Sequence, residues 1–387
     1  MTNNLPSIRF REFSDGWNFE SFSSFATVIK GKFNPLKDTE SKKCVELEHL
    51  SKGTGQVLGF IDSATQKSTK NSFKKGHVLF GKLRPNLRKY AIAPFEGVCS
   101  SEILVLNSTK LKNEFLFNLL STERFYRAST ISSGTKMPRA DMDFINAYPF
   151  YYPNSVKEQQ KIADFLSTVD KKNSLLKEKH ALLAQYKKGV MQKLFSQEIR
   201  FKDENGNDFP DWKIEPIGKY LEEYKERVTV ETDIPILTSS RTGLYLQKRK
   251  VINEGEYGVV PKGYFTYRHM SDDLTFKFNL NREWDKGAVS KEYPVFKTVG
   301  MNSYFLETCL NEGNDFKRFA IQQKVGGTRT RLYYKNLVTL KLNTPSLDEQ
   351  NKITDFLQTL DKKIKLVKKQ IEQTQTFKKG LLQQMFV

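Results

Sequence analysis

The chain has 387 residues, a formal net charge of +19 and 38% hydrophobic residues, including 29 Phe and 16 Tyr. This length indicates two or three domains, and the apolar content argues against intrinsic disorder. Without a run of about 18 apolar residues, a signal-peptide core or paired cysteines, we expect a soluble cytoplasmic protein with no membrane partner.

The first stretch, residues 1–157, alternates short β-like runs with turns and predicts a mixed α+β domain. The β-like runs include GHVLFGKL and SSEILVLN, and a helical pattern covers residues 113–130. The stretch opens with IRFREFSDGW, which ends at Trp17. It closes with SSGTKMPRADMDFINAYPFYYPN, where a Gly-Thr and basic residues precede an aromatic strand and a proline.

Basic residues in this stretch are separated from acidic ones. Between Ser63 and Phe95 there are eight Lys or Arg and no acid, and residues 124–140 are also free of acids. Such segregation is typical of a surface that follows nucleic-acid phosphates, although a solvated basic surface is the usual alternative. The predicted DNA contacts here are Lys82, Arg84, Arg88, Lys89, Lys136 and Arg139.

Residues 158–195 predict a long helix, because they contain no proline and many Lys, Glu, Gln and Leu. The same segment returns at 349–386 with 18 identities in 38 positions, so residues 349–387 are predicted to form a second long helix. The matches include EQ at the start, Asp170 with Asp361, and KKG at 187–189 with 378–380.

Both helices carry apolar residues at heptad spacing, which is typical of a coiled coil. In the second copy Ile353, Leu360 and Val367 begin one seam row, and a second row follows four residues behind. We expect the helices to pair antiparallel as a pseudo-twofold repeat, although each could instead cap its own domain. The residues expected to face each other are Ile162, Val169, Leu176 and Leu183 on one helix and Leu360, Ile364, Val367 and Ile371 on the other.

The second stretch, residues 196–348, is framed like the first. It opens with IRFKDENGNDFPDW, which ends at Trp212, and closes with VGGTRTRLYYKNLVTLKLNTPS. The sequences between these ends do not resemble each other. Residues 316–347 hold seven Lys or Arg and no acid. The predicted DNA contacts here are Arg241, Tyr267, Arg268, Arg329 and Arg331.

No pattern in the sequence predicts catalysis. The four histidines are isolated, and no HExxH or CxxC spacing suggests a metal site. The glycines of GTGQVLG have the wrong spacing for a dinucleotide fingerprint, and neither a P-loop nor an amino-methyltransferase motif is present. We therefore expect no catalytic residue, no metal and no cofactor bound by this chain.

These features together resemble the specificity subunit of type I restriction-modification enzymes over essentially the whole chain. The resemblance rests on the two EQ.KI.DFL...DKK helices, the RF...W openings, the Gly-Thr-strand-proline closings and the block GHVLFGKLRPNLRKYAIAPFEGVCSSEILVL. It implies two α+β target-recognition domains joined by an antiparallel coiled coil of two long helices.

The resemblance also implies the function and the partners. The chain would read an asymmetric bipartite site in double-stranded DNA and recruit two methyltransferase subunits and two restriction subunits. S-adenosylmethionine, ATP and Mg²⁺ would bind those partners. Two alternatives are a modification or restriction enzyme with a fused recognition region, and a non-catalytic structural or RNA-binding coiled-coil protein.

Overall fold

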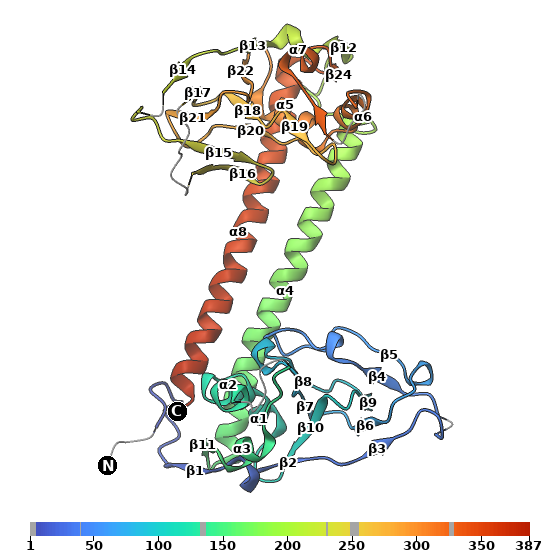
Figure 1. The fold of residues 1–387 in the computed structure, drawn as a ribbon, viewed down its shortest axis with the longest axis vertical. Helices are drawn as coiled ribbons and strands as arrows, with labels where there is room; N and C mark the ends of the chain where they lie inside the picture. The colour runs from blue at the N-terminus through green and yellow to red at the C-terminus, as the bar shows by residue number, and fades with distance from the viewer. Residues whose placement is uncertain (1–4, 39, 132–136, 230, 248–254, 325–328) are drawn as a thin grey trace. The chain divides into compact units, whose positions relative to one another are not determined.

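The computed structural model describes residues 5–38, 40–131, 137–229, 231–247, 255–324 and 329–387. The chain forms two compact units, which we call unit 1 (Met1–Lys179 with Val367–Val387) and unit 2 (His180–Leu366). Each unit includes part of both long helices, which run as single helices in Figure 1. We call the part of each unit outside the long helices its head.

Within its described residues, the head of unit 1 contains a two-stranded, a four-stranded and a five-stranded sheet and three short α-helices (Figure 1). The strands are β1 (Trp17–Ser21), β2 (Ala26–Val28), β3 (Lys32–Phe33), β4 (Lys43–Val45), β5 (Ile61–Asp62), β6 (Lys70–Phe73), β7 (Val78–Gly81), β8 (Tyr90–Ile92), β9 (Gly97–Cys99), β10 (Ile103–Ser108) and β11 (Pro149–Pro153). The helices are α1 (Asn113–Leu120), α2 (Glu123–Thr130) and α3 (Met142–Ala147).

The described part of the head of unit 2 also combines small sheets with three short α-helices. Its strands are β12 (Lys213–Pro216), β13 (Leu221–Glu223), β14 (Arg227–Val228), β15 (Leu237–Ser240), β16 (Gly243–Leu246), β17 (Tyr257–Pro261), β18 (Phe265–Tyr267), β19 (Met270–Ser271), β20 (Phe278–Leu280), β21 (Lys286–Ser290), β22 (Val295–Thr298), β23 (Thr330–Arg331) and β24 (Lys341–Thr344). Its helices are α5 (Ser303–Glu312), α6 (Asn314–Gln322) and α7 (Tyr334–Leu337).

The two heads repeat one architecture. In unit 1 the four-stranded sheet has the order β2-β10-β7-β8, and in unit 2 the order β13-β22-β18-β20 follows the same path. A two-stranded antiparallel sheet, β1-β11 or β12-β24, joins the beginning of each head to its end. The remaining sheets differ, with β3-β6-β9-β4-β5 in unit 1 against β14-β17-β21 and the hairpin β15-β16 in unit 2. The predicted α+β class is confirmed, and the heads share more than their framing ends.

The long helices are α4 (Val156–Phe195) and α8 (Leu347–Met385). In unit 1, Ile162 and Val169 near the start of α4 share a buried cluster with Leu381 and Met385 at the end of α8. In unit 2, the end of α4 and the start of α8 share another cluster. The predicted antiparallel pairing is confirmed.

The predicted register of the helix pair is wrong at the start of α4. Ile162 and Val169 were expected to face residues 360–371, but their cluster contains residues 381–386 of α8. The reason is geometric, because in an antiparallel pair the first residues of one helix must lie beside the last residues of the other. The seam rows themselves are buried or half-buried along both helices, and Val367 and Leu360 are among the most buried.

The repeated Glu at the start of each long helix fastens the opening of each head. Glu158 accepts hydrogen bonds from Arg9 at 2.6 and 2.8 Å and from the indole of Trp17 at 3.2 Å. Its carboxylate is fully paired, as burial of a charge requires. In unit 2 the same three roles are taken by a second set: Glu349 binds Arg200 at 3.1 and 2.8 Å and Trp212 at 2.9 Å.

The following Gln fastens the middle of each head. Gln159 accepts from the backbone N–H of Lys112, just before α1, at 3.0 Å and donates to the carbonyl of Pro153 at 2.9 Å. Gln350 makes the equivalent bonds to Asn302 and Pro345, at 2.9 and 3.0 Å. The repeated EQ motif therefore has a structural role, which is to hold each head on its helix.

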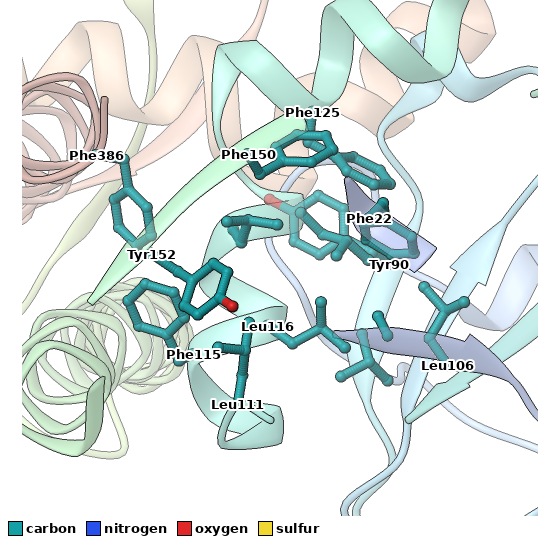
Figure 2. Packing of buried hydrophobic residues seen from close by; sticks show 14 of the residues in the cluster. Phe22, Tyr90, Leu106, Leu111, Phe115, Leu116, Phe125, Phe150, Tyr152 and Phe386 are labelled. Atoms are coloured by element: carbon teal, nitrogen blue, oxygen red, sulfur yellow. The ribbon is translucent and has the colours of Figure 1, made fainter. Parts of the chain in front are cut away.

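Aromatic residues fill the core of unit 1 (Figure 2). The rings of Phe125 and Phe150 lie 5.9 and 5.8 Å from that of Phe22. Phe386, just beyond α8, points toward Phe115 of α1, with the ring centroids 5.3 Å apart. The end of the second repeated helix is thus part of the core of the first head.

Candidate nucleic-acid interface

Arg84 and Arg88 lie on either side of a short turn, Pro85–Leu87, after β7. Both adopt left-handed backbone conformations, with φ of 53° and 49°. Non-glycine residues rarely adopt this conformation, and they are concentrated at functional sites. Arg84 is exposed, and its backbone N–H donates to the carbonyl of Pro138 at 2.8 Å. The turn therefore presents Arg84 to solvent from an anchored backbone.

The other basic residues of unit 1 that were predicted to contact DNA differ in how much of the charged group is free to bind a phosphate. Arg88 binds Glu123 at 2.7 Å and lies 3.9 Å from the ring centroid of Tyr126. Lys89 donates to the carbonyl of Leu47, and burial lowers the pKa of its ammonium group. Its predicted role as a DNA contact therefore conflicts with its half-buried internal bond.

Three further predicted positions belong to this unit. Arg139 is exposed and binds Glu102 at 3.1 Å. Lys82 is half-buried and directly follows β7. Lys136 lies outside the described residues.

The prediction is wrong for Tyr267 of unit 2. This side chain has no exposed surface, its hydroxyl donates to the carbonyl of Leu332 at 3.1 Å, and burial raises its pKa. Its ring packs 4.6 Å from that of Phe278 in the core. Because side chains alternate along a strand, the adjacent Arg268 is exposed instead.

The four arginines of unit 2 that were predicted to contact DNA fall into two groups, those paired with a carboxylate and those that are not. Arg241 binds Asp273 at 2.7 and 2.9 Å, and Arg329 binds Asp272 at 2.9 Å. Arg268 and Arg331 are exposed and have no carboxylate oxygen within 4.0 Å in the part of the chain that the structure describes.

The absence of acidic residues from a stretch of sequence did not predict which arginines lack an acidic partner in the fold. Arg88, Arg139 and Arg329 lie in stretches of sequence without acids, yet each is paired in space with an acid from another segment. Exposed ion pairs of this kind contribute about 0–1 kcal/mol each, so a phosphate can displace the carboxylate at little cost.

A pocket of about 1020 Å³ in unit 1 brings together cations that sequence reasoning missed. Its lining includes Arg127 of α2, Lys177 of α4 and Lys379 of α8, together with the paired residues Arg88 and Lys378. Arg127 lies in an acid-free stretch, which was a usable signal. The two lysines gave no such signal, because only folding brings three distant segments to one pocket.

The described residues contain no group of three or more His, Cys, Asp or Glu side chains placed to hold a metal ion. None of the described helices is long and apolar enough to cross a membrane.

Comparison with known proteins identifies the family. Residues 15–185 and 275–375 match the family model described as type I restriction modification DNA specificity domain. The specificity subunit of the type I restriction enzyme EcoDI from Escherichia coli is 30% identical over 163 residues, which cover 41% of this chain but only 34% of that subunit. The specificity subunit of the enzyme MjaVIII from Methanocaldococcus jannaschii is 23% identical over 321 residues, 74% of this chain and 73% of that one.

The fold agrees with this result. The crystal structure of a type I restriction-modification S subunit from M. genitalium superposes with a TM-score of 0.60 at 15% identity, and the match covers 99% of both chains. The family model matches well over half of this chain, including both long helices in large part. The chain therefore belongs to the family of type I restriction-modification DNA specificity domains.

Proposed function

We propose that this chain is the DNA-recognition subunit of a type I restriction-modification complex and that its two heads read the two parts of an asymmetric, bipartite site in double-stranded DNA. The observation that carries the proposal is the repeat itself. Each unit fastens its head by the same Arg-Glu-Trp contacts and repeats the same four-stranded sheet, whereas the additional sheets differ. A shared sheet and shared anchoring contacts would place both heads in the same way on their helices, and the differing additional sheets would let each head recognise a different DNA sequence.

The chain supplies recognition, and its partners supply chemistry. Two methyltransferase subunits would modify adenine, and two restriction subunits would translocate and cleave DNA. S-adenosylmethionine, ATP and Mg²⁺ would bind to those subunits. The net charge of +19 supports binding to DNA through counterion release.

Exposed apolar residues at matching positions of the repeat support two equivalent docking surfaces. Leu175 and Phe377 of unit 1 are 55% and 54% exposed. The residues 191 positions away from them, Leu366 and Tyr186 of unit 2, are 57% and 54% exposed. Large apolar side chains at the same two exposed places in both copies are expected where each copy binds the same partner subunit.

The proposal is tested by expressing the chain together with its methyltransferase partner and mapping methylated adenines across the host genome. We expect one bipartite motif, which disappears when the chain is omitted. The purified, partner-free chain should transfer no methyl groups. Methylation by the chain alone, or an unchanged motif in its absence, would overturn the assignment.

A further inference from the structure

The closing segment of each head forms one strand of a short antiparallel ribbon. In unit 2 the ribbon is β19-β23, where Met270 pairs with Arg331 and Ser271 with Thr330. The backbone N–H of Leu332 donates to the carbonyl of His269 at 2.8 Å and extends the pairing. The ribbon directly follows β18 of the four-stranded sheet.

The same ribbon occurs in unit 1, after the corresponding strand β7. Leu83 pairs with Arg139, and the backbone N–H of Ala140 donates to the carbonyl of Lys82 at 2.8 Å. By this bonding pattern Arg139 corresponds to Arg331 and Leu83 to Met270. Each arginine is exposed, and the residue after it, Ala140 or Leu332, is buried. Two heads whose additional sheets differ thus present an arginine from the same point of the same ribbon.

Alternation of side chains separates the two faces of the ribbon in unit 2. The inner face is buried and consists of Tyr267, His269, Ser271, Thr330 and Leu332. The outer face carries Arg268, Met270, Asp272, Arg329 and Arg331. The three arginines and one aspartate give this face an excess of positive charge, as an element that approaches phosphates requires.

Tyr333 follows the ribbon, two residues after the end of β23. Its side chain is 46% exposed, and its ring stacks on that of the buried His269, with a centroid distance of 5.8 Å and an interplanar angle of 25°. The Nδ1 atom of His269 has no hydrogen-bond partner among the described residues, and the face of its ring supports that of Tyr333. A rigidly supported, exposed aromatic loses little conformational entropy when it binds a ligand.

We propose that this ribbon is the base-reading element of each head, with Arg139 and Arg331 as specificity-determining residues and Tyr333 as a further base contact in unit 2. The proposal rests on the DNA-recognition function proposed above. A two-stranded β-ribbon fits the major groove, where an arginine can donate two hydrogen bonds to guanine and an apolar group can contact the methyl group of thymine. The ion pair between Arg139 and Glu102 would hold the first arginine in place before DNA binds.

The test uses the full chain expressed with its methyltransferase partner, and the methylation motif as the readout. The variants are Arg139→Lys and Arg331→Lys, because lysine keeps the charge and loses the bidentate geometry. Arg227→Ala is the matched control, since Arg227 is an exposed, ion-paired arginine of unit 2 outside the ribbon. Arg331→Lys should relax one position of one half-site and Arg139→Lys one position of the other. Discrimination at that position should fall roughly 5- to 150-fold.

The outcomes separate this proposal from the function on which it rests. If the wild-type complex yields a bipartite motif and both lysine variants keep it unchanged, the ribbon is not the reader. A uniform loss of methylation with an unchanged motif would make these arginines phosphate contacts and would also overturn the proposal. If the wild-type complex yields no motif, the recognition function fails and the ribbon proposal fails with it.

Discussion

Lys378 of α8 donates hydrogen bonds to both carboxylate oxygens of Asp170 of α4, at 2.6 and 2.7 Å. In unit 2, Lys187 of α4 binds Asp361 of α8 at 2.8 Å, so the repeat-related residues exchange helices. A parallel pair in equal register would instead place Asp170 beside Asp361. The repeated aspartate and lysine therefore favour the antiparallel arrangement and disfavour the parallel one.

Reversing the charge of Asp170 or of Lys378 alone should destabilise the protein, whereas reversing both charges together should cost little stability. Asp170→Lys places two lysines together at a half-buried position and should lower the free energy of unfolding by about 1–3 kcal/mol, between the values for surface and buried pairs. The double variant Asp170→Lys/Lys378→Asp should recover most of this loss. Denaturant unfolding of Asp170→Lys, Lys378→Asp and the double variant checks the prediction, and a loss in the double variant equal to the sum of the two single losses would contradict it.

Removal of the buried carboxylate that fastens the second head should be more severe. Glu349 has no exposed surface, and Glu349→Ala leaves Arg200 and the indole of Trp212 without their partner. We expect a loss of about 3–5 kcal/mol in the free energy of unfolding, as for other broken buried ion pairs.

The control for this variant is Glu223→Ala, which removes a solvent-exposed pair with Lys225 in the same unit. It should change the unfolding free energy by less than about 1 kcal/mol. Equal effects of the two substitutions would show that the contacts of Glu349 do not hold the head in place.

The stability of unit 2 should fall with acidity because of His269. Burial lowers its pKa below the ordinary value of 6.5, and the nearby Arg331 and Arg268 lower it further, against the opposite effect of Glu292. As the pH falls below about 6.5, His269 is therefore protonated in the unfolded chain while it is still neutral in the folded chain. The contribution of His269 to the free energy of unfolding is constant above about pH 6.5, and it is lost as the pH falls below that value toward the folded-state pKa.

Comparison of the wild type with His269→Gln between about pH 7.5 and 5 checks this dependence. The wild type should lose more unfolding free energy over this range than the variant. The pKa of His77 in unit 1 is also lowered by burial, so His77→Gln provides the background for the remaining acid sensitivity. Parallel pH profiles for the wild type and His269→Gln would contradict the prediction.

The helices and the repeat could be predicted because their signals are local. Heptad spacing and the absence of proline predicted α4 and α8 to within two residues of their observed starts and ends. The register could not be predicted in the same way, because it depends on which residues of the two helices lie side by side. The shared four-stranded sheet was also missed, because small and divergent strands such as β8 and β20 carry little sequence signal.

The composition of short stretches of sequence was not enough to predict which individual side chains could contact DNA. Tyr267 and Arg268 are neighbours in the sequence, yet one is in the core and the other is exposed, because the strand turns alternate side chains to opposite faces. Tyr333 was not selected, since its support depends on the stacking of its ring on His269, which is more than 60 residues away in the sequence. Windows identified basic clusters, but only the fold shows which side chains within them face solvent.

The most direct test of the account is an exchange of the second head. Residues 196–346, which lie between α4 and α8, are replaced by the corresponding segment of another family member, and the methylation motif of the complex is read by sequencing. Glu349 and Gln350 remain in place to fasten the new head. We expect one half-site to change while the other half-site and the spacer stay the same. A change in both half-sites, or in neither, would show that the two heads do not each read their own part of the DNA site.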